Sequence, residues 1–189
     1  MPKGGPKAVA AYRGARLGKS RHGKQRKAVF LNVPYDSKYE RLYIAFIAGL
    51  CGFGLVPRAT VELPGSERRL ARIISLIRRC RYSFHDLSRV QLDAGRPRTP
   101  RLNMPFELGL AVAQALNQRG RHEWFVFEAR PHRLSKSLSD LAGTDPHIHG
   151  GKALGVLRSL ANTLSRNKNR PKLGELEMIY RDVEKAAAR

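Results

Sequence analysis

The sequence predicts an α/β domain in which helices cover both faces of a parallel sheet of about five strands. Between residues 28 and 150, short apolar runs rich in β-forming residues alternate with longer segments of helical periodicity. The runs are almost continuously apolar, as strands buried on both faces are, and glycines or prolines follow most of them. Two more helical patterns follow, and residues 151–189 are predicted to form a C-terminal helical extension.

Each element follows from a local pattern. Apolar, β-forming runs predict strands over 27–33, 56–61, 82–86 and 124–127, and a short fifth strand over 146–149. Apolar residues at helical spacing predict helices over 37–53, from Ser66 through Ile77, 104–118, 134–142, 152–165 and 173–187.

The chain is strongly basic, with 36 Lys and Arg against 15 Asp and Glu and a formal net charge of +21. This charge favours anionic partners: nucleic acid, nucleotides or an acidic protein. Residues 1–27 hold nine basic residues and no acid, which predicts a flexible arm that binds nucleic acid or an acidic partner. The candidate nucleic-acid contacts of the arm are Lys19, Arg21, Lys24, Arg26 and Lys27.

No apolar run is long enough to span a membrane, and the N-terminus lacks the apolar core of a secretory signal. A cytoplasmic protein without a membrane partner is therefore expected.

Polar side chains concentrate where three predicted elements reach one edge of the sheet. Residues 32–36 follow the first strand, residues 85–89 end and follow the third, and Glu107 lies at the start of the helix over 104–118. Ligands of parallel sheets bind beyond the carboxyl ends of the strands, so this edge is the expected site.

The start of that helix reads Asn103-Met104-Pro105-Phe106-Glu107-Leu108-Gly109-Leu110-Ala111. Proline is tolerated at a helix start, and Glu107 then falls in or near the first turn, where the helix dipole favours an ionised carboxylate. An ionised acid on an apolar helix beside a cleft suits a nucleophile or a stabiliser of an oxocarbenium ion. The alternative is an acid that only helps the helix to begin.

This order of elements and the Met-Pro-Phe-Glu-Leu-Gly-Leu-Ala motif resemble the nucleoside 2-deoxyribosyltransferase-like group, which is structurally akin to TIR domains and flavodoxin-like in fold. The resemblance covers roughly residues 28–150 and is specific around Glu107, Leu108 and Gly109. It implies that Glu107 is the nucleophile that attacks the anomeric carbon of the sugar. It also implies that Asp86, after the third strand, handles the leaving base.

TIR-type NADases also use a Glu on a helix beside the cleft, so the resemblance implies NAD, a nucleotide or a nucleoside as the substrate. One segment departs from the family: Asn32-Val33-Pro34-Tyr35 stands where the family has a Gly-Tyr-type substrate loop. Transferases of this group complete their sites across subunits, which allows a homo-oligomer.

The expected chemistry is cleavage of an N-glycosidic bond, which builds positive charge on the sugar. A carboxylate at Glu107 would stabilise that charge or form a glycosyl-enzyme, and Asp86, kept protonated by burial, would protonate the departing base. The alternative for Asp86 is a cap or turn residue before Ser88. His85 can orient Asp86 or donate a proton, but strand alternation puts it on the opposite face.

Further residues are predicted to shape the pocket. The candidate substrate contacts are Asn32, Tyr35, Asp36, Ser88, Arg89 and Asn103. The basic loop over 88–102 also supplies Arg96, Arg98 and Arg101, and we take Arg98 and Arg101 as phosphate contacts because guanidinium groups match phosphate oxygens. A solvated basic loop is the alternative.

His147 and His149 share a face of the short fifth strand and could bind a metal, but they lack a third ligand at a convincing spacing. A polar rim of the site, or a contact with ribose or phosphate, is the favoured role for them. No metal and no cofactor are expected, and NAD enters only as a substrate. The favoured function is an N-glycosidase or N-glycosyl transferase, and the resemblance implies a prokaryotic defence effector, for example against viruses. The alternatives are a non-catalytic nucleotide-sensing or assembly module of the same fold, and a nucleic-acid-binding protein that uses the arm.

Overall fold

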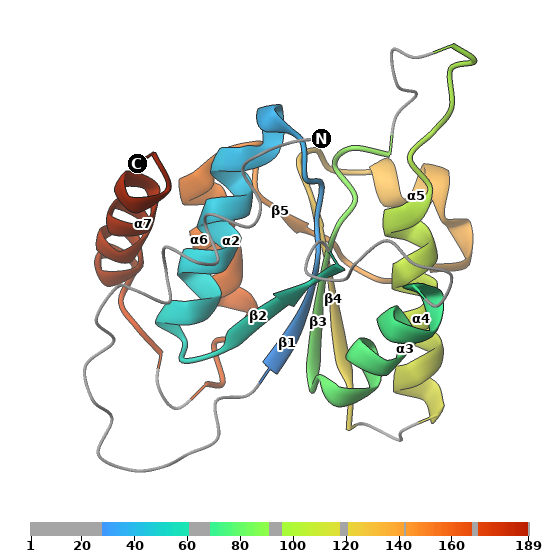
Figure 1. The fold of residues 1–189 in the computed structure, drawn as a ribbon, viewed down its shortest axis with the longest axis horizontal. Coiled ribbons are helices and arrows are strands. Elements are labelled where there is room, and N and C mark those ends of the chain that lie inside the picture. The colour runs from blue at the N-terminus through green and yellow to red at the C-terminus, as the bar shows by residue number, and fades with distance from the viewer. Residues whose placement is uncertain are drawn as a thin grey trace.

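Five parallel strands form one sheet in the order β2-β1-β3-β4-β5 (Figure 1). The computed structural model describes residues 28–60, 69–90, 96–117, 121–141, 143–167 and 170–188. The strands are β1 (Ala28–Asn32), β2 (Val56–Ala59), β3 (Tyr82–Asp86), β4 (Glu123–Glu128) and β5 (His147–Ile148). The predicted α/β class, with a parallel sheet between two helical layers, is confirmed.

The helices coincide with the predicted segments to within a few residues. They are η1 (Ser37–Tyr39), α2 (Glu40–Gly52), α3 (Arg69–Arg79), α4 (Asn103–Asn117), α5 (Arg133–Ser137), η3 (Ser139–Leu141), α6 (Ala153–Thr163) and α7 (Leu173–Ala187). Ser66, the expected cap of α3, and the basic arm of residues 1–27 lie outside the described residues.

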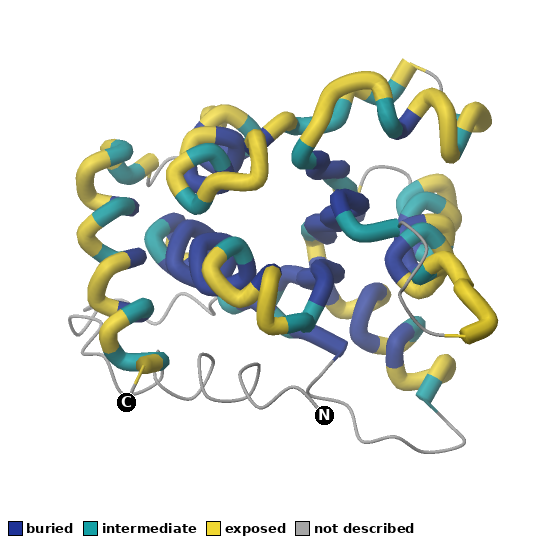
Figure 2. Tube along the Cα trace, turned by 90° about the horizontal axis from the view of Figure 1, so that it is seen from above, coloured by how far each residue is buried: buried dark blue, intermediate teal, exposed yellow. Residues whose placement is uncertain are grey.

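Alternation along the strands divides the core between the two faces of the sheet. Leu31, Phe84 and Phe127 belong to the core that α2, α6 and α7 cover, whereas Phe30 packs with α3 and α4 and Val126 packs with α4 and α5. Figure 2 shows the sheet and the inner faces of the helices buried, with the outward faces of the helices exposed. The central residues of β1 and β4 are apolar because both faces of the sheet are covered, and the polar residues lie mainly at the strand ends.

Two glycines of α2 allow the C-terminal helices to approach closely. A Cβ on Gly49 would lie 2.5 Å from the Leu160 side chain, and one on Gly52 would lie 2.5 Å from that of Leu176. Both leucines are fully buried in the main core. The helices α6 and α7 therefore pack on the sheet domain, and the buried apolar side chains of α7 belong to its main core.

Among the described residues, no helix is both long enough and apolar enough to cross a membrane.

Candidate functional site

A hollow of about 620 Å³ lies between the segment after β1 and the segment that leads into α4. Its lining residues are Tyr35, Asp36, Ser37, Pro100, Arg101, Leu102, Asn103 and Met104. The hollow is at the carboxyl end of β1, where ligands of parallel sheets bind. Three of the predicted substrate contacts, Tyr35, Asp36 and Asn103, share this hollow.

Asn32 ties the end of β1 to its neighbours. Its amide nitrogen donates to the carbonyl oxygen of Met104 at 2.9 Å and to Nδ1 of His85 at 3.0 Å. The side chain is buried and its amide donors point to protein atoms, so Asn32 positions the start of α4. Burial lowers the pKa of His85 to about 3, so its ring is neutral, and the ring faces α4 as the strand alternation predicts.

Glu107 is buried, with 6 % of its surface exposed, and its Oε2 has no hydrogen-bond partner within the described structure. Burial raises the pKa of this carboxyl from 4.5 to about 7, although the Arg69 guanidinium acts in the opposite direction. Burial therefore outweighs the helix dipole in setting the pKa of Glu107, contrary to the expectation from the sequence. Since α4 begins at Asn103, Glu107 lies one residue beyond the first turn, and the dipole effect fades there.

The neighbours of Glu107 connect it to the hollow. Met104 precedes Glu107 by one turn of α4 and lines the hollow. Tyr35, from the segment after β1, is also a lining residue. The phenol of Tyr35 donates to the carbonyl of Leu31 at 3.1 Å, and burial raises its pKa, with a smaller contribution from the Glu107 charge. Glu107 is not itself a lining residue of the hollow, and its link to the hollow is through Tyr35, on whose phenol its charge acts, and through Met104 in the same helix.

Two arginines of the basic loop converge on Asp36. One oxygen of Asp36, Oδ2, lies 3.0 Å from Nη1 of Arg101 and 3.4 Å from Nη2 of Arg89. Asp36 and Arg101 both line the hollow. Arg98, the other predicted phosphate contact, is exposed and has no ion pair with any described residue. The structure therefore groups Arg89 with Arg101, and not Arg98 with Arg101.

Asp86 is fully buried and accepts hydrogen bonds from three directions. The Tyr39 hydroxyl and Nε2 of His149 donate to Oδ2, the latter at 2.8 Å, and the backbone N–H of Ser88 donates to Oδ1 at 2.8 Å. Three donors suit a carboxylate that accepts hydrogen bonds, and the neutral acid expected from burial alone would have to give up one of them. Asp86 is therefore buried, as the sequence predicts. It also accepts a hydrogen bond from the backbone of Ser88, as the turn residue considered as the alternative would.

Ser88, His149 and Asp86 do not form a nucleophilic triad. Both Oγ of Ser88, at 3.1 Å, and Oδ2 of Asp86 contact the same ring nitrogen, Nε2. The other nitrogen, Nδ1, accepts from the backbone N–H of Gly151 at 3.1 Å. In a triad the histidine uses one nitrogen for the serine and the other for the acid, so this arrangement serves to hold the strand ends together.

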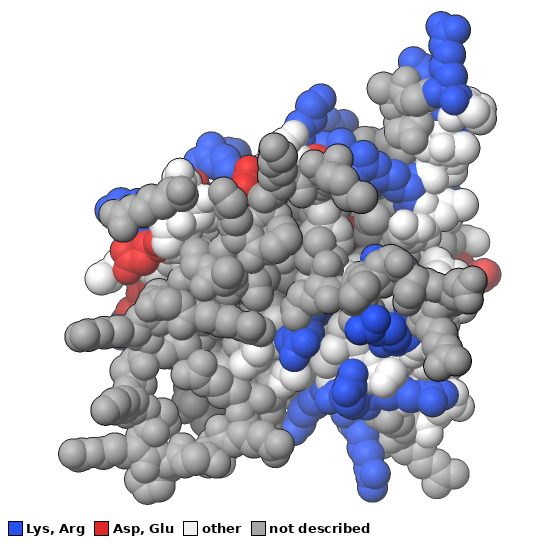
Figure 3. Space-filling view, viewed as in Figure 1, with Lys and Arg blue, Asp and Glu red and all other residues white. Residues whose placement is uncertain are grey.

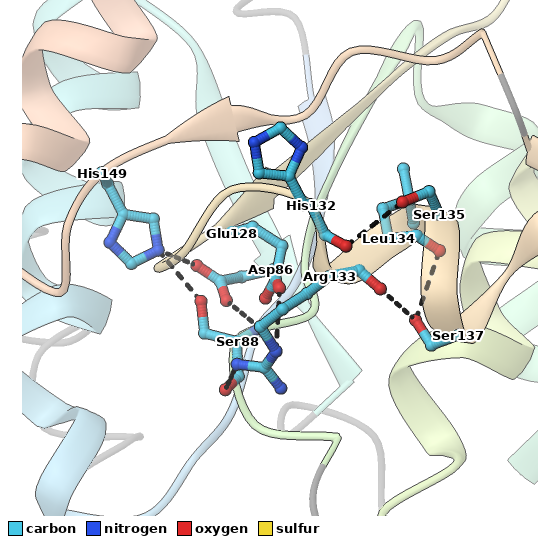
Figure 4. Close-up of polar contacts among 9 residues, drawn as sticks. All are labelled: Asp86, Ser88, Glu128, His132, Arg133, Leu134, Ser135, Ser137 and His149. Atoms are coloured by element: carbon cyan, nitrogen blue, oxygen red, sulfur yellow. Dashed lines mark hydrogen bonds and ion pairs between the residues drawn. The ribbon is translucent and has the colours of Figure 1, made fainter.

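Glu128 and Arg133 extend this network at the end of β4 (Figure 4). Nε of Arg133 lies 3.3 Å from Oε2 of Glu128, and its Nη1 donates to the carbonyl of Ser88 at 3.1 Å. Glu128 is 1 % exposed, and burial raises the pKa of its carboxyl against the effect of Arg133. Arg133 thereby ties the loop that carries Arg89 to β4 and α5.

The two predicted catalytic carboxyls face opposite sides of the sheet. Asp86 joins Tyr39 and His149 on the side of α2 and α6, whereas Glu107 is on α4, which packs on the other side. No hydrogen bond or ion pair joins Asp86 to Glu107 within the described ranges.

Sequence reasoning misses three members of the Asp86 network. The pattern assigns Tyr39 to an apolar helix stripe and gives Glu128 and Arg133 no role. One local signal is present: Glu128 is a charged residue that ends β4 directly after the apolar run 124–127, and Asp86 likewise ends β3. His149 is singled out by the sequence, but as a metal ligand or rim residue. Among the described residues, no group of three or more His, Cys, Asp and Glu side chains could hold a metal ion.

Comparison of the chain with protein-family models gives no match, and comparison with curated proteins gives none at a significant level.

Proposed function

We propose that this protein cleaves or transfers the N-glycosidic bond of a nucleotide, NAD or a nucleoside, with Glu107 as its catalytic residue. The observation that carries the proposal is the buried carboxyl of Glu107, whose Oε2 is unpaired in the described structure and whose charge acts on Tyr35, a lining residue of the hollow. A buried, unpaired carboxyl is costly for a fold, and such groups occur where chemistry uses them. The motif around Glu107 and its resemblance to nucleoside 2-deoxyribosyltransferases support the same residue.

In the proposed reaction the ionised Glu107 attacks the anomeric carbon, and the bond from that carbon to the base nitrogen breaks. The base leaves with the electron pair. A purine or pyrimidine takes a proton from water, whereas the nicotinamide of NAD leaves as a neutral molecule and needs none. Water, or a second base, then attacks the glycosyl ester and regenerates the carboxylate. Because burial raises the pKa of Glu107 to about 7, a large share of the enzyme is protonated at neutral pH and must lose that proton before it can attack.

Asp86 has a different role in this proposal from the one that the resemblance implies. Its three donors and its position on the α2 side favour a positioning residue that fixes Ser88, and through it the Arg89 loop. Water in the hollow is a better proton donor for the leaving base than Asp86, because the Asp86 carboxylate already accepts three hydrogen bonds.

Arg89 and Arg101 favour a phosphorylated substrate. Their guanidinium groups meet at one oxygen of Asp36, which uses only part of their hydrogen-bonding capacity, and each is partly exposed. A phosphate monoester or diphosphate entering the hollow can take bidentate contacts from these groups. A nucleotide or NAD is therefore preferred to a bare nucleoside as the substrate.

The same arginines also favour the second candidate function, a module that binds a nucleotide without cleaving it. The two functions differ in a single outcome, because only the enzyme releases free base from the compound that it binds.

The test is to incubate the full chain with NAD, nucleosides and nucleotides and to follow free base by chromatography. Glu107→Gln should reduce release by at least about a hundredfold, as removal of a nucleophile does. Glu40→Gln, at an exposed acid in the first turn of α2, is the matched control and should release base like the wild type. Equal release by the wild type and Glu107→Gln would overturn the assignment of Glu107. Binding without release by the wild type would replace the enzyme with the binding module.

A further inference from the structure

An exposed group of arginines lies along α3 and at the amino ends of β3 and β4, away from the carboxyl end of the sheet where the hollow lies. Its members are Arg72, Arg78, Arg79, Arg81 and Arg121, and we call them the arginine face. Figure 3 shows basic side chains gathered in the part of the view where α3 lies in Figure 1. The helix α3 contains no acidic residue, and its apolar side is buried against the sheet.

Backbone contacts bring the parts of the arginine face together. The register of β3 with β4 pairs Tyr82 with Glu123, and the backbone N–H of Glu123 donates to the carbonyl of Arg81 at 2.9 Å. The ring of His122 also contacts the carbonyl of Cys80 at 2.8 Å through Nδ1. Arg121 therefore lies beside the end of α3, although more than forty residues separate them in the sequence.

Little of this positive charge is neutralised by the protein. Arg81 lies 3.6 Å from Glu123 in an ion pair in which both side chains are about half exposed. For Arg72, Arg78, Arg79 and Arg121, no ion pair with an acid occurs in the described part of the chain. Exposed guanidinium groups without acids favour an anionic partner with several charges along its length.

The basic arm enters the fold at the same end. Residues 1–27, with nine basic residues and no acid, connect to β1 at Ala28. The next residue, Val29, is in register with Tyr82, directly after Arg81. The point where the arm joins β1 thus lies beside Arg81 of the arginine face.

We infer that the arginine face binds the phosphate backbone of a nucleic acid, at a surface separate from the hollow. Several observations favour nucleic acid over other anions. The face is made of arginines, whose forks match phosphate oxygens, and the charges extend over α3 and the starts of β3 and β4. The helix α3 exposes one large apolar side chain, Leu70 in its first turn, whereas a surface that inserts into a membrane presents a continuous apolar face.

The test measures binding of the full chain to a short labelled duplex DNA and to a single-stranded RNA by fluorescence anisotropy at several salt concentrations. The triple variant Arg78→Gln/Arg79→Gln/Arg121→Gln should weaken binding at least about tenfold and reduce the slope of log K against log salt by about one for each arginine that binds a phosphate in the wild type. The control variant Arg158→Gln/Arg166→Gln/Arg181→Gln makes the same charge change at exposed positions of α6, the turn after it, and α7. It should bind like the wild type.

A second variant tests the arm within the full chain by changing Lys19, Arg21, Lys24, Arg26 and Lys27 to Gln. Binding should fall again, and further when the two sets are combined. Equal affinity and salt slope for the arginine-face and control variants would overturn the proposal, even if the arm variant no longer bound. Loss of binding to phosphatidylserine vesicles without loss of nucleic-acid binding in the arginine-face variant would also overturn it, in favour of a membrane surface.

Discussion

Nε2 of His149 donates a hydrogen bond to Oδ2 of Asp86 at 2.8 Å, which connects the segment after β5 to the end of β3 across the intervening strand β4. Both side chains are buried. The pair also holds Ser88, the first polar residue of the loop that leads to the arginines near the hollow. The geometry of the candidate site therefore depends on a contact made on the other face of the sheet.

Removing the imidazole should cost much of the stability of the fold. His149→Ala leaves Asp86 buried with one fewer donor and opens a cavity, so the free energy of unfolding should fall by about 2–4 kcal/mol. His147→Ala, which removes ring contacts with Phe125 and Phe127, should cost about 1 kcal/mol or less. Urea unfolding of both variants measures the difference. Equal losses would show that the contact with Asp86 contributes nothing.

Alanine substitution at two helical glycines should change the stability of the protein in opposite directions. A Cβ on Gly155 of α6 would lie 1.9 Å from the carbonyl oxygen of His149, whereas one on Gly174 of α7 would meet nothing within 4 Å. Gly155→Ala should destabilise the protein by about 1–3 kcal/mol because backbone has to move. Gly174→Ala should stabilise it by about 0.5–1 kcal/mol because alanine favours a helix. Thermal unfolding of the pair checks both signs, and a neutral Gly155→Ala would contradict the packing described for His149.

Stability should depend on pH through Glu107. Its pKa is about 7 in the folded protein and near 4.5 in the unfolded chain, so the folded state holds more protons between these values. The contribution is therefore fully present below about pH 4.5 and is lost as pH rises to about 7, at most about 3 kcal/mol in size. Unfolding of the wild type and of Glu107→Gln across this window measures it. An unchanged slope in the variant would mean that Glu107 is ionised in the fold.

The arginines of the loop 88–102 should differ in their effect on nucleotide binding. Arg101 pairs with Asp36 and lines the hollow, whereas Arg98 is exposed and is not a lining residue, so Arg101→Gln should weaken binding of a nucleoside monophosphate about tenfold or more. Arg98→Gln should change it little, and neither should alter binding of the nucleoside. Isothermal titration in a Glu107→Gln background avoids turnover. Equal effects of the two variants would indicate general attraction by a basic loop.

Much of the architecture could be predicted from the sequence because it depends on local patterns. The strand of Tyr82–Asp86 and the helix of Leu173–Ala187 were predicted at their observed bounds. Apolar periodicity reports which side of an element is buried, whatever that side packs against. The same patterns placed Asp36, Asp86 and Glu107 near the carboxyl ends of the strands.

The sequence by itself thus determined the class of fold, the order of its elements and which polar residues lie at the carboxyl edge of the sheet. Only the tertiary structure decided the partners of those residues. Asp36 meets Arg101 across 65 residues, and Asp86 meets His149 across 63. Local pattern carries no information on such pairs, because a polar side chain at a strand end satisfies its hydrogen bonds with whichever loops meet there. The raised pKa of Glu107 has the same origin, since burial depends on the packing of α4 against the sheet and not on the helix alone.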